Sequence, residues 1–97
     1  MDFNSIIKET PEKIKEYLTP EKIREYGFKS GKVVKLIKAT GDVGKYINRE
    51  VIEAGELDNY DVENLIKATG DIERYITPEM IKMGRLSAYQ VKNLIIW

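Results

Sequence analysis

The chain contains no cysteine and no histidine. The absence of thiols excludes a disulfide framework and cysteine chemistry, and the absence of imidazole removes the commonest general base and the usual zinc ligands. We therefore expect no metal and no cofactor. A chain of 97 residues can bury a hydrophobic core without disulfides or a metal, so we predict one domain spanning residues 1–97. The absence of cysteine also leads us to expect a reducing compartment.

Long apolar runs are also missing. No stretch approaches the roughly 18 apolar residues that indicate a membrane span, and the first ten residues lack the basic and apolar segments of a signal peptide. We expect a soluble protein in the cytoplasm.

Neither sign of charge is in excess over the whole chain, which has 16 basic and 16 acidic residues. The two halves differ, however. Residues 1–49 hold 11 Lys or Arg against 7 Asp or Glu, giving +4, and residues 50–97 hold 5 against 9, giving −4. Such a dipole favours a directed electrostatic contact with a partner or head-to-tail self-association.

The most informative feature of the chain is an internal repeat. Residues 36–64 recur without a gap at 65–93, and 16 of the 29 paired positions are identical. With one extra residue near Pro11, residues 1–35 follow the same pattern. We divide the chain into units 1–35, 36–64 and 65–93 and a partial unit 94–97. A fixed period in this range indicates stacked supersecondary units.

The pattern of each unit predicts three short helices, so we expect an all-α fold. The longest helix of each unit has apolar residues at i, i+3 and i+4. It begins after Ser30, Asp58 or Ser87 and ends at Gly41 or Gly70. A short helix follows, capped by Thr10, Asp42 or Asp71. The third begins at Thr19-Pro20, Asn48-Arg49 or Thr77-Pro78 and is closed by Gly27, Gly55 or Gly84.

Both ends of the chain fall on the pattern of the longest helix, so we expect both to cap the stack, with Trp97 covering the last unit. Three units of short helices, with this start of a fourth, predict a small solenoid-like bundle stabilised by packing between units. The pattern resembles small α-helical solenoid repeats as a class. That resemblance concerns architecture, and it implies a binding surface by analogy.

No catalytic motif is apparent. The serines have no histidine to activate them, and helix capping and solvation account for the carboxylates. Gly41 to Gly44 lack the Gly-Lys-Ser or Gly-Lys-Thr signature of a phosphate loop, and the position of Gly44 is Glu73 in the next unit. We predict that the chain is not an enzyme.

Positions that differ between units are free to carry function. Tyr60 and Tyr89 open two successive long helices, where an amphipathic ring suits a protein interface. A stretch of acids without an intervening base surrounds Tyr60. We take as candidate partner-binding residues Tyr60, Tyr89, Glu53, Glu56, Asp58, Asp61 and Glu63. For the acids, the alternative is a solvated face, and for the tyrosines it is packing between units.

A run of lysines without an intervening acid suggests a second class of function. Lysine contacts to phosphates would give salt-dependent, sequence-independent nucleic-acid binding. The candidates are Lys29, Lys32, Lys35 and Lys38. The zero net charge and the presence of only four arginines argue against this interpretation.

Our first hypothesis is a non-catalytic helical repeat protein that binds another protein. The small size, the absence of cysteine and a composition typical of AT-rich genomes would suit a phage or mobile-element inhibitor of a bacterial complex, such as an anti-CRISPR protein. The alternatives are a nucleic-acid or phosphate-binding module using the lysines, and a self-assembling structural protein. The sequence leaves open whether the protein is a monomer or an oligomer.

Overall fold

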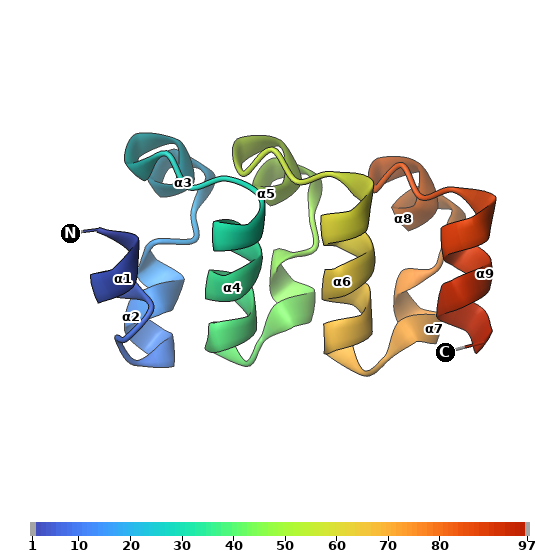
Figure 1. The fold of residues 1–97 in the computed structure, drawn as a ribbon, viewed down its shortest axis with the longest axis horizontal. Coiled ribbons are helices and arrows are strands. Elements are labelled where there is room, and N and C mark those ends of the chain that lie inside the picture. Colours follow the sequence, from blue (N-terminus) through green and yellow to red (C-terminus); the bar gives the residue numbers. More distant parts are fainter. Residues whose placement is uncertain (1, 97) are drawn as a thin grey trace.

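A computed structural model describes residues 2–96, and every regular element in this range is helical (Figure 1). In order, the elements are α1 (Phe3–Ile6), α2 (Pro11–Glu16), α3 (Pro20–Tyr26), α4 (Gly31–Thr40), the 3₁₀ helix η1 (Val43–Tyr46), α5 (Arg49–Ala54), α6 (Asn59–Thr69), α7 (Ile72–Tyr75), α8 (Pro78–Met83) and α9 (Ala88–Ile96). The all-α prediction is confirmed for this part of the chain.

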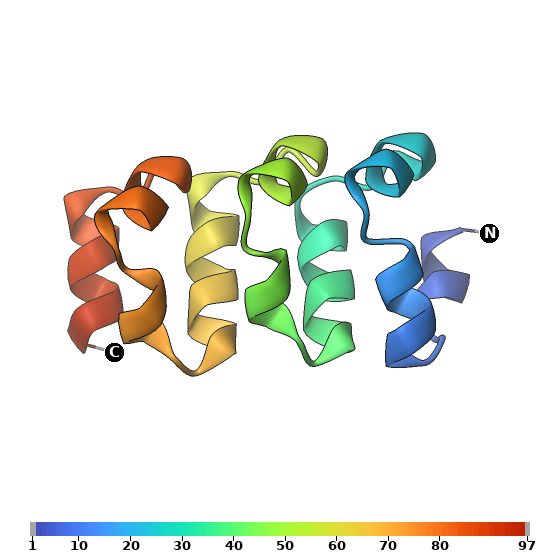
Figure 2. The same ribbon diagram turned by 180° about the vertical axis from the view of Figure 1, so that it is seen from behind.

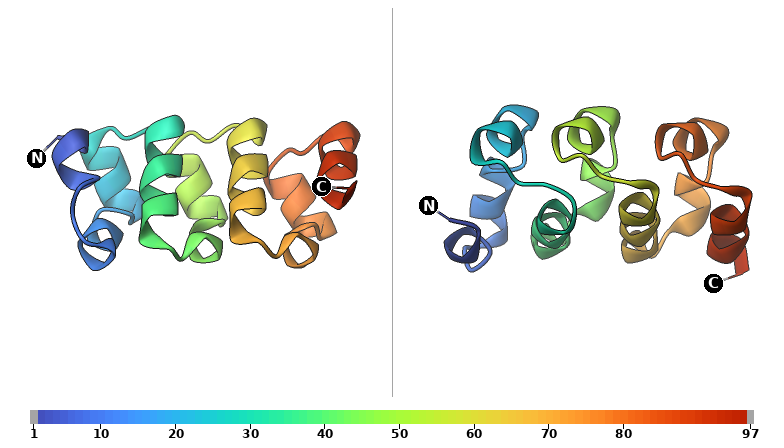
Figure 3. Two further views of the ribbon diagram at one scale, coloured as in Figure 1. Left: turned by 60° about the horizontal axis from the view of Figure 1, so that its bottom comes forward. Right: turned by 45° about the horizontal axis from the view of Figure 1, so that its top comes forward.

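The helices form three rows along an elongated body of 39 × 21 × 17 Å. The long helices α4, α6 and α9 stand side by side in one row, and α3, α5 and α8 form a second row across their upper ends (Figure 1). The third row, α2, η1 and α7, lies on the far side of the long helices in Figure 1 and comes to the front in Figure 2. Views from above and below show the long helices as a separate layer on one side (Figure 3).

The core lies between the rows. Each long helix contributes its i, i+3, i+4 stripe, so Val33, Leu36 and Ile37 of α4 are fully buried, as are Leu65 and Ile66 of α6. The short helices would not persist alone in water, because helices of under about 12 residues are marginal. Packing of these apolar stripes therefore supplies their stability.

Local capping explains most helix starts. The side chains of Thr10, Thr19, Asn48 and Thr77 each accept from a backbone N–H in the first turn of the following helix. Asp58 and Asp61 form a reciprocal capping box at α6. Ser87 accepts from the Gln90 N–H at 3.1 Å, and these predicted caps are confirmed.

Three predicted caps are wrong. Ser30 makes no capping hydrogen bond, because its backbone, at φ 48° and ψ −119°, is far from the extended conformation that a cap requires. Asp42 and Asp71 also fail to cap, since their ψ angles of 53° and 61° lie outside the extended region that a capping residue occupies. Their N–H groups instead donate to Thr40 and Thr69 Oγ1 at 3.1 Å.

The helix ends also differ from one unit to the next. Gly27, Gly41 and Gly70 have a φ of 70° and close their helices in the left-handed conformation. At Gly55 and Gly84 the φ is negative, and the positive φ falls on the next residue, Glu56 or Arg85. These two glycines are explained by packing instead.

A Cβ on Gly55 would lie 2.9 Å from Cγ2 of Val33 on α4, and a Cβ on Gly84 would lie 2.7 Å from Cγ1 of Val62 on α6. Helices α4 and α6 thus each press a valine onto the glycine that ends the short helix of the following unit. The first unit has Tyr26 at this position, and its ring stacks on Phe28 with centroids 5.6 Å apart.

The two ends of the chain are unequal. We expected a long helix at both, but α1 has only four residues. Its Phe3 meets Phe28 edge to face at 6.1 Å, so an aromatic cluster covers this end of the described chain. The prediction for Trp97 lies outside the described residues.

Candidate protein-binding surface

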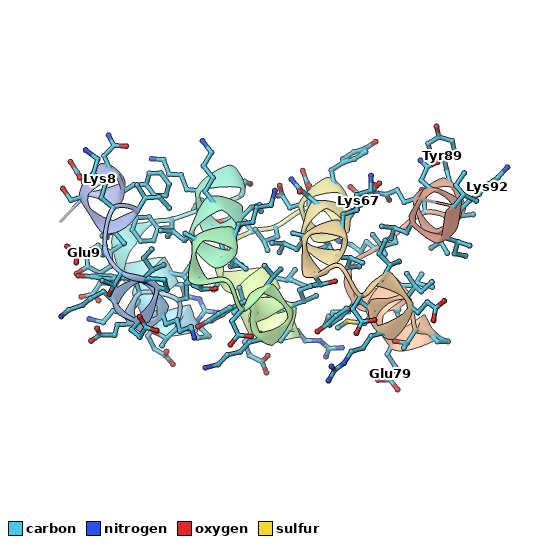
Figure 4. All side chains as sticks on the ribbon, turned by 90° about the horizontal axis from the view of Figure 1, so that it is seen from below. Lys8, Glu9, Lys67, Glu79, Tyr89 and Lys92 are labelled. Carbon is cyan, nitrogen blue, oxygen red and sulfur yellow. The ribbon has the colours of Figure 1, made fainter. Side chains whose placement is uncertain are left out.

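Two tyrosines project from the outer side of the long helices. Tyr60 of α6 is 71% exposed and Tyr89 of α9 is 73% exposed, although large aromatic side chains are usually buried. Tyr89 points away from the body, on the side opposite to Glu79 of α8 (Figure 4). Both tyrosines are the second residue of their helix, so the 29-residue spacing presents them equivalently.

The same side of α4 has no ring, because Gly31 stands at the equivalent position. It carries lysines instead. Lys32, Lys35 and Lys38 are all exposed on this one helix. The Lys32 ammonium lies 5.7 Å from the centroid of the Phe3 ring, a cation–π contact that holds it toward the α1 end.

Lys29 does not belong to this group of lysines. It precedes α4 and forms an ion pair with Glu56, with 2.7 Å between Nζ and Oε2. The structure therefore brings together three of the four candidate lysines and separates the fourth.

The candidate acids do not form one acidic surface. Asp58 and Asp61 cap α6. Glu56 pairs with Lys29, and Glu63 pairs with Lys67 at 3.2 Å while accepting a hydrogen bond from Gln90 Nε2 at 3.0 Å. Glu53 alone among these acids has an exposed side chain with no hydrogen bond or ion pair to another residue of the range 2–96. Most of the acidic stretch is thus engaged in internal contacts.

The capping box also changes the acidity of one carboxyl. Partial burial raises the pKa of Asp61 above its ordinary value, and the neighbouring Asp58 carboxylate adds to this effect, against the hydrogen bond donated by the Asp58 N–H. Because its carboxylate already accepts from the Asp58 N–H at 3.1 Å, Asp61 is a poor candidate for an ionic contact with a partner.

With these acids engaged, the row of long helices is basic. Helices α4, α6 and α9 carry five lysines, at positions 32, 35, 38, 67 and 92, against two acids, Asp61 and Glu63, which gives +3. Sequence reasoning did not select Lys67 and Lys92. The repeat could have indicated Lys67, because Lys67 occupies the position of Lys38 one unit later.

The described residues hold no group of three or more His, Cys, Asp or Glu side chains placed to bind a metal ion. In the same range, no helix has the length and apolar character needed to cross a membrane. The arrangement offers rings and ammonium groups on an exposed surface, which suits contact with a macromolecule.

Comparison with known proteins adds no identification: no family model, curated protein or solved structure matches this chain.

Proposed function

We propose that this chain is a non-catalytic helical repeat protein, stacked as a small solenoid, that binds another protein through the outer side of α6 and α9. The observation that carries the proposal is the exposure of Tyr60 and Tyr89 at equivalent places on adjacent helices. A tyrosine gives a large rigid contact area at low entropic cost, and tyrosines are enriched among the residues that dominate binding energy.

The charge around the rings favours an acidic partner surface. The row of long helices that carries the tyrosines has a charge balance of +3, and complementary charge accelerates encounter and suppresses wrong partners. Of the acids proposed as binding residues, Asp58 and Asp61 contribute by fixing the start of α6, and hence the position of Tyr60, rather than by direct contact.

The test is affinity capture from lysate of the source cell with nuclease present, followed by an affinity measurement on the captured protein. Replacing both rings, Tyr60→Ala with Tyr89→Ala, should weaken binding at least tenfold, since central aromatic residues contribute about 2 kcal/mol or more each. The matched control is Glu12→Ala with Glu73→Ala, two exposed residues of other helices. Equal capture by the tyrosine variant and the wild type would refute the proposal.

Nucleic-acid binding is the second candidate, and the three exposed lysines of α4 favour it. Phosphate contacts would make binding fall steeply with salt. Lys32→Glu with Lys35→Glu should then abolish binding of a labelled oligonucleotide, measured by fluorescence anisotropy. Capture that is lost on nuclease treatment would also favour this candidate over a protein partner.

Inhibition of a bacterial complex by a phage or mobile-element protein stays a prediction from size and composition. It requires inhibition that is stoichiometric in the target, without turnover. Self-assembly also stays a prediction, and the exposed Ile95 and Ile96 near the end of α9 are the side chains that it would bury.

A further inference from the structure

A groove separates α5 from α8. Two cavities, of about 580 and 720 Å³, open between these helices. Arg49, Lys82 and Met83 line both, so the cavities join into one groove. It runs from the turn after α5, at Leu57, to the turn before α5, at Ile47. No residue of α4, α6 or α9 lines it, so it is distinct from the surface with the two tyrosines.

The groove exists because two small residues are replaced by larger ones. Helices α3 and α5 pack directly on each other, whereas α5 and α8 are not among the closely packed pairs. The last residue of α5 is Ala54, which is buried, and its equivalent in α8 is Met83, which is only partly buried. Val51, also buried, is replaced by the partly buried Met80. Bulkier side chains at these positions hold α8 away from α5.

Methionine and leucine side chains make the groove apolar. Met80 and Met83 line it together with Ile52 and Leu57. Methionine is unbranched and polarizable, so it adapts to ligands of different shape and recurs on peptide-binding surfaces. Both cavity volumes fall within the range of about 300 to 1,000 Å³ that is typical of ligand-binding pockets.

The rim of the groove is basic. Its cations are Arg49, Arg74, Lys82 and Arg85, and its acids are Glu53, Glu56 and Glu79. Because Glu56 is already paired with Lys29, four cations face two free acids, a balance of +2. None of the four cations forms an ion pair with another residue of the 2–96 range, although the Arg85 guanidinium donates to the Leu57 carbonyl at 3.3 Å.

We propose that this groove binds a short acidic segment of a partner protein, with a leucine-like side chain seated between Met80 and Met83. Apolar contact supplies the affinity, and the uncompensated cations select acidic flanks. This proposal does not depend on the surface with Tyr60 and Tyr89, so an experiment can refute one of the two binding proposals and leave the other intact.

The direct test is an NMR titration of the full chain labelled with ¹³C at the methionine methyl groups. The probe is a 12-residue peptide of glutamates with two leucines. Two control peptides have lysine in place of glutamate, or alanine in place of leucine. The Met80 and Met83 methyl signals should move saturably with the first peptide and much less with either control.

A charge reversal in the groove then tests whether its cations contribute to the affinity for the acidic peptide. Lys82→Glu should weaken binding of the acidic peptide about tenfold, which corresponds to about 1.4 kcal/mol. The control is Arg24→Glu, the same change of charge at the equivalent position of α3, and it should alter the affinity less than twofold. Lys82 and Arg24 are both exposed, so neither change should impair folding.

Three results would overturn the proposal. Methyl signals that do not move at millimolar peptide would show that the groove binds no such segment. Methyl shifts of equal size with the peptide that has alanine in place of leucine would show that charge alone causes the binding. Shifts that follow protein concentration without any peptide would make a second copy of the chain the occupant.

Discussion

At the scale of single residues, Ser30 is the clearest local conflict between sequence and backbone. Its φ of 48° with ψ −119° belongs to a region that residues other than glycine rarely adopt, and such strain costs about 1 to 3 kcal/mol. The conformation is held by tertiary contacts. The Ser30 N–H donates to the Gly55 carbonyl at 2.8 Å, which ties the start of α4 to the end of α5.

We predict that Ser30→Gly stabilises the protein by about 1 kcal/mol, because relief of strain exceeds the extra entropy of glycine in the unfolded chain. Only a long hydroxyl contact to the Glu56 carbonyl, 3.4 Å, is lost. Urea denaturation measures the change. Ser87→Gly is the control and should cost a few tenths of a kcal/mol, since Ser87 is a true cap. A variant less stable than the wild type would contradict the interpretation of Ser30 as strained.

At the scale of elements, the contacts between successive units depend on two glycines. Gly55→Ala would place a methyl group against Val33, so we predict a loss of about 1 to 3 kcal/mol through overpacking. The control is Gly31→Ala, where nothing lies within 4 Å of the added methyl group and the backbone is helical, so stability should stay the same or rise slightly. Thermal unfolding monitored by circular dichroism compares the two. A similar effect of both changes would argue against the valine contact.

At the scale of the whole molecule, burial declines toward the third unit. The helices η1 and α5 bury Val43, Tyr46, Val51, Ile52 and Ala54, whereas their equivalents α7 and α8 have no fully buried residue. Fewer buried apolar contacts mean a lower free energy of local opening.

We therefore predict that amide protons of α7 and α8 exchange with solvent at least tenfold faster than those of η1 and α5. Native-state hydrogen exchange followed by NMR gives this comparison within one sample. Equal protection in the two pairs of helices would mean that the chain opens only as a whole.

The sequence predicts helix positions well because their signals are local. Thr-Pro at a helix start and glycine after its last turn act through neighbouring backbone groups, so Thr19 and Gly41 behave as expected. Asp42 failed as a cap because its backbone, at φ −129° and ψ 53°, is not extended, a conformation that the residue type alone does not reveal.

The candidate surface was predictable only in part. The register placed Tyr60 and Tyr89 at equivalent positions, and the structure leaves both exposed. The ion pair of Lys29 with Glu56 joins residues 27 positions apart, so nothing near Lys29 in the sequence indicated it. The α5–α8 groove depends on the size of Met83 relative to Ala54, and the effect of that difference appears only when two units are packed together.

The valine-to-glycine contact has a further consequence for protein engineering. Val33 meets Gly55 and Val62 meets Gly84 in the same way, so the two successive junctions use the same pair of residue types at the same register. A duplicate of residues 36–64 placed after Asn64 would offer its own Gly to Val62 and its own Val to Gly84. We therefore expect that the chain can be extended in steps of 29 residues with this valine–glycine contact kept at each new junction.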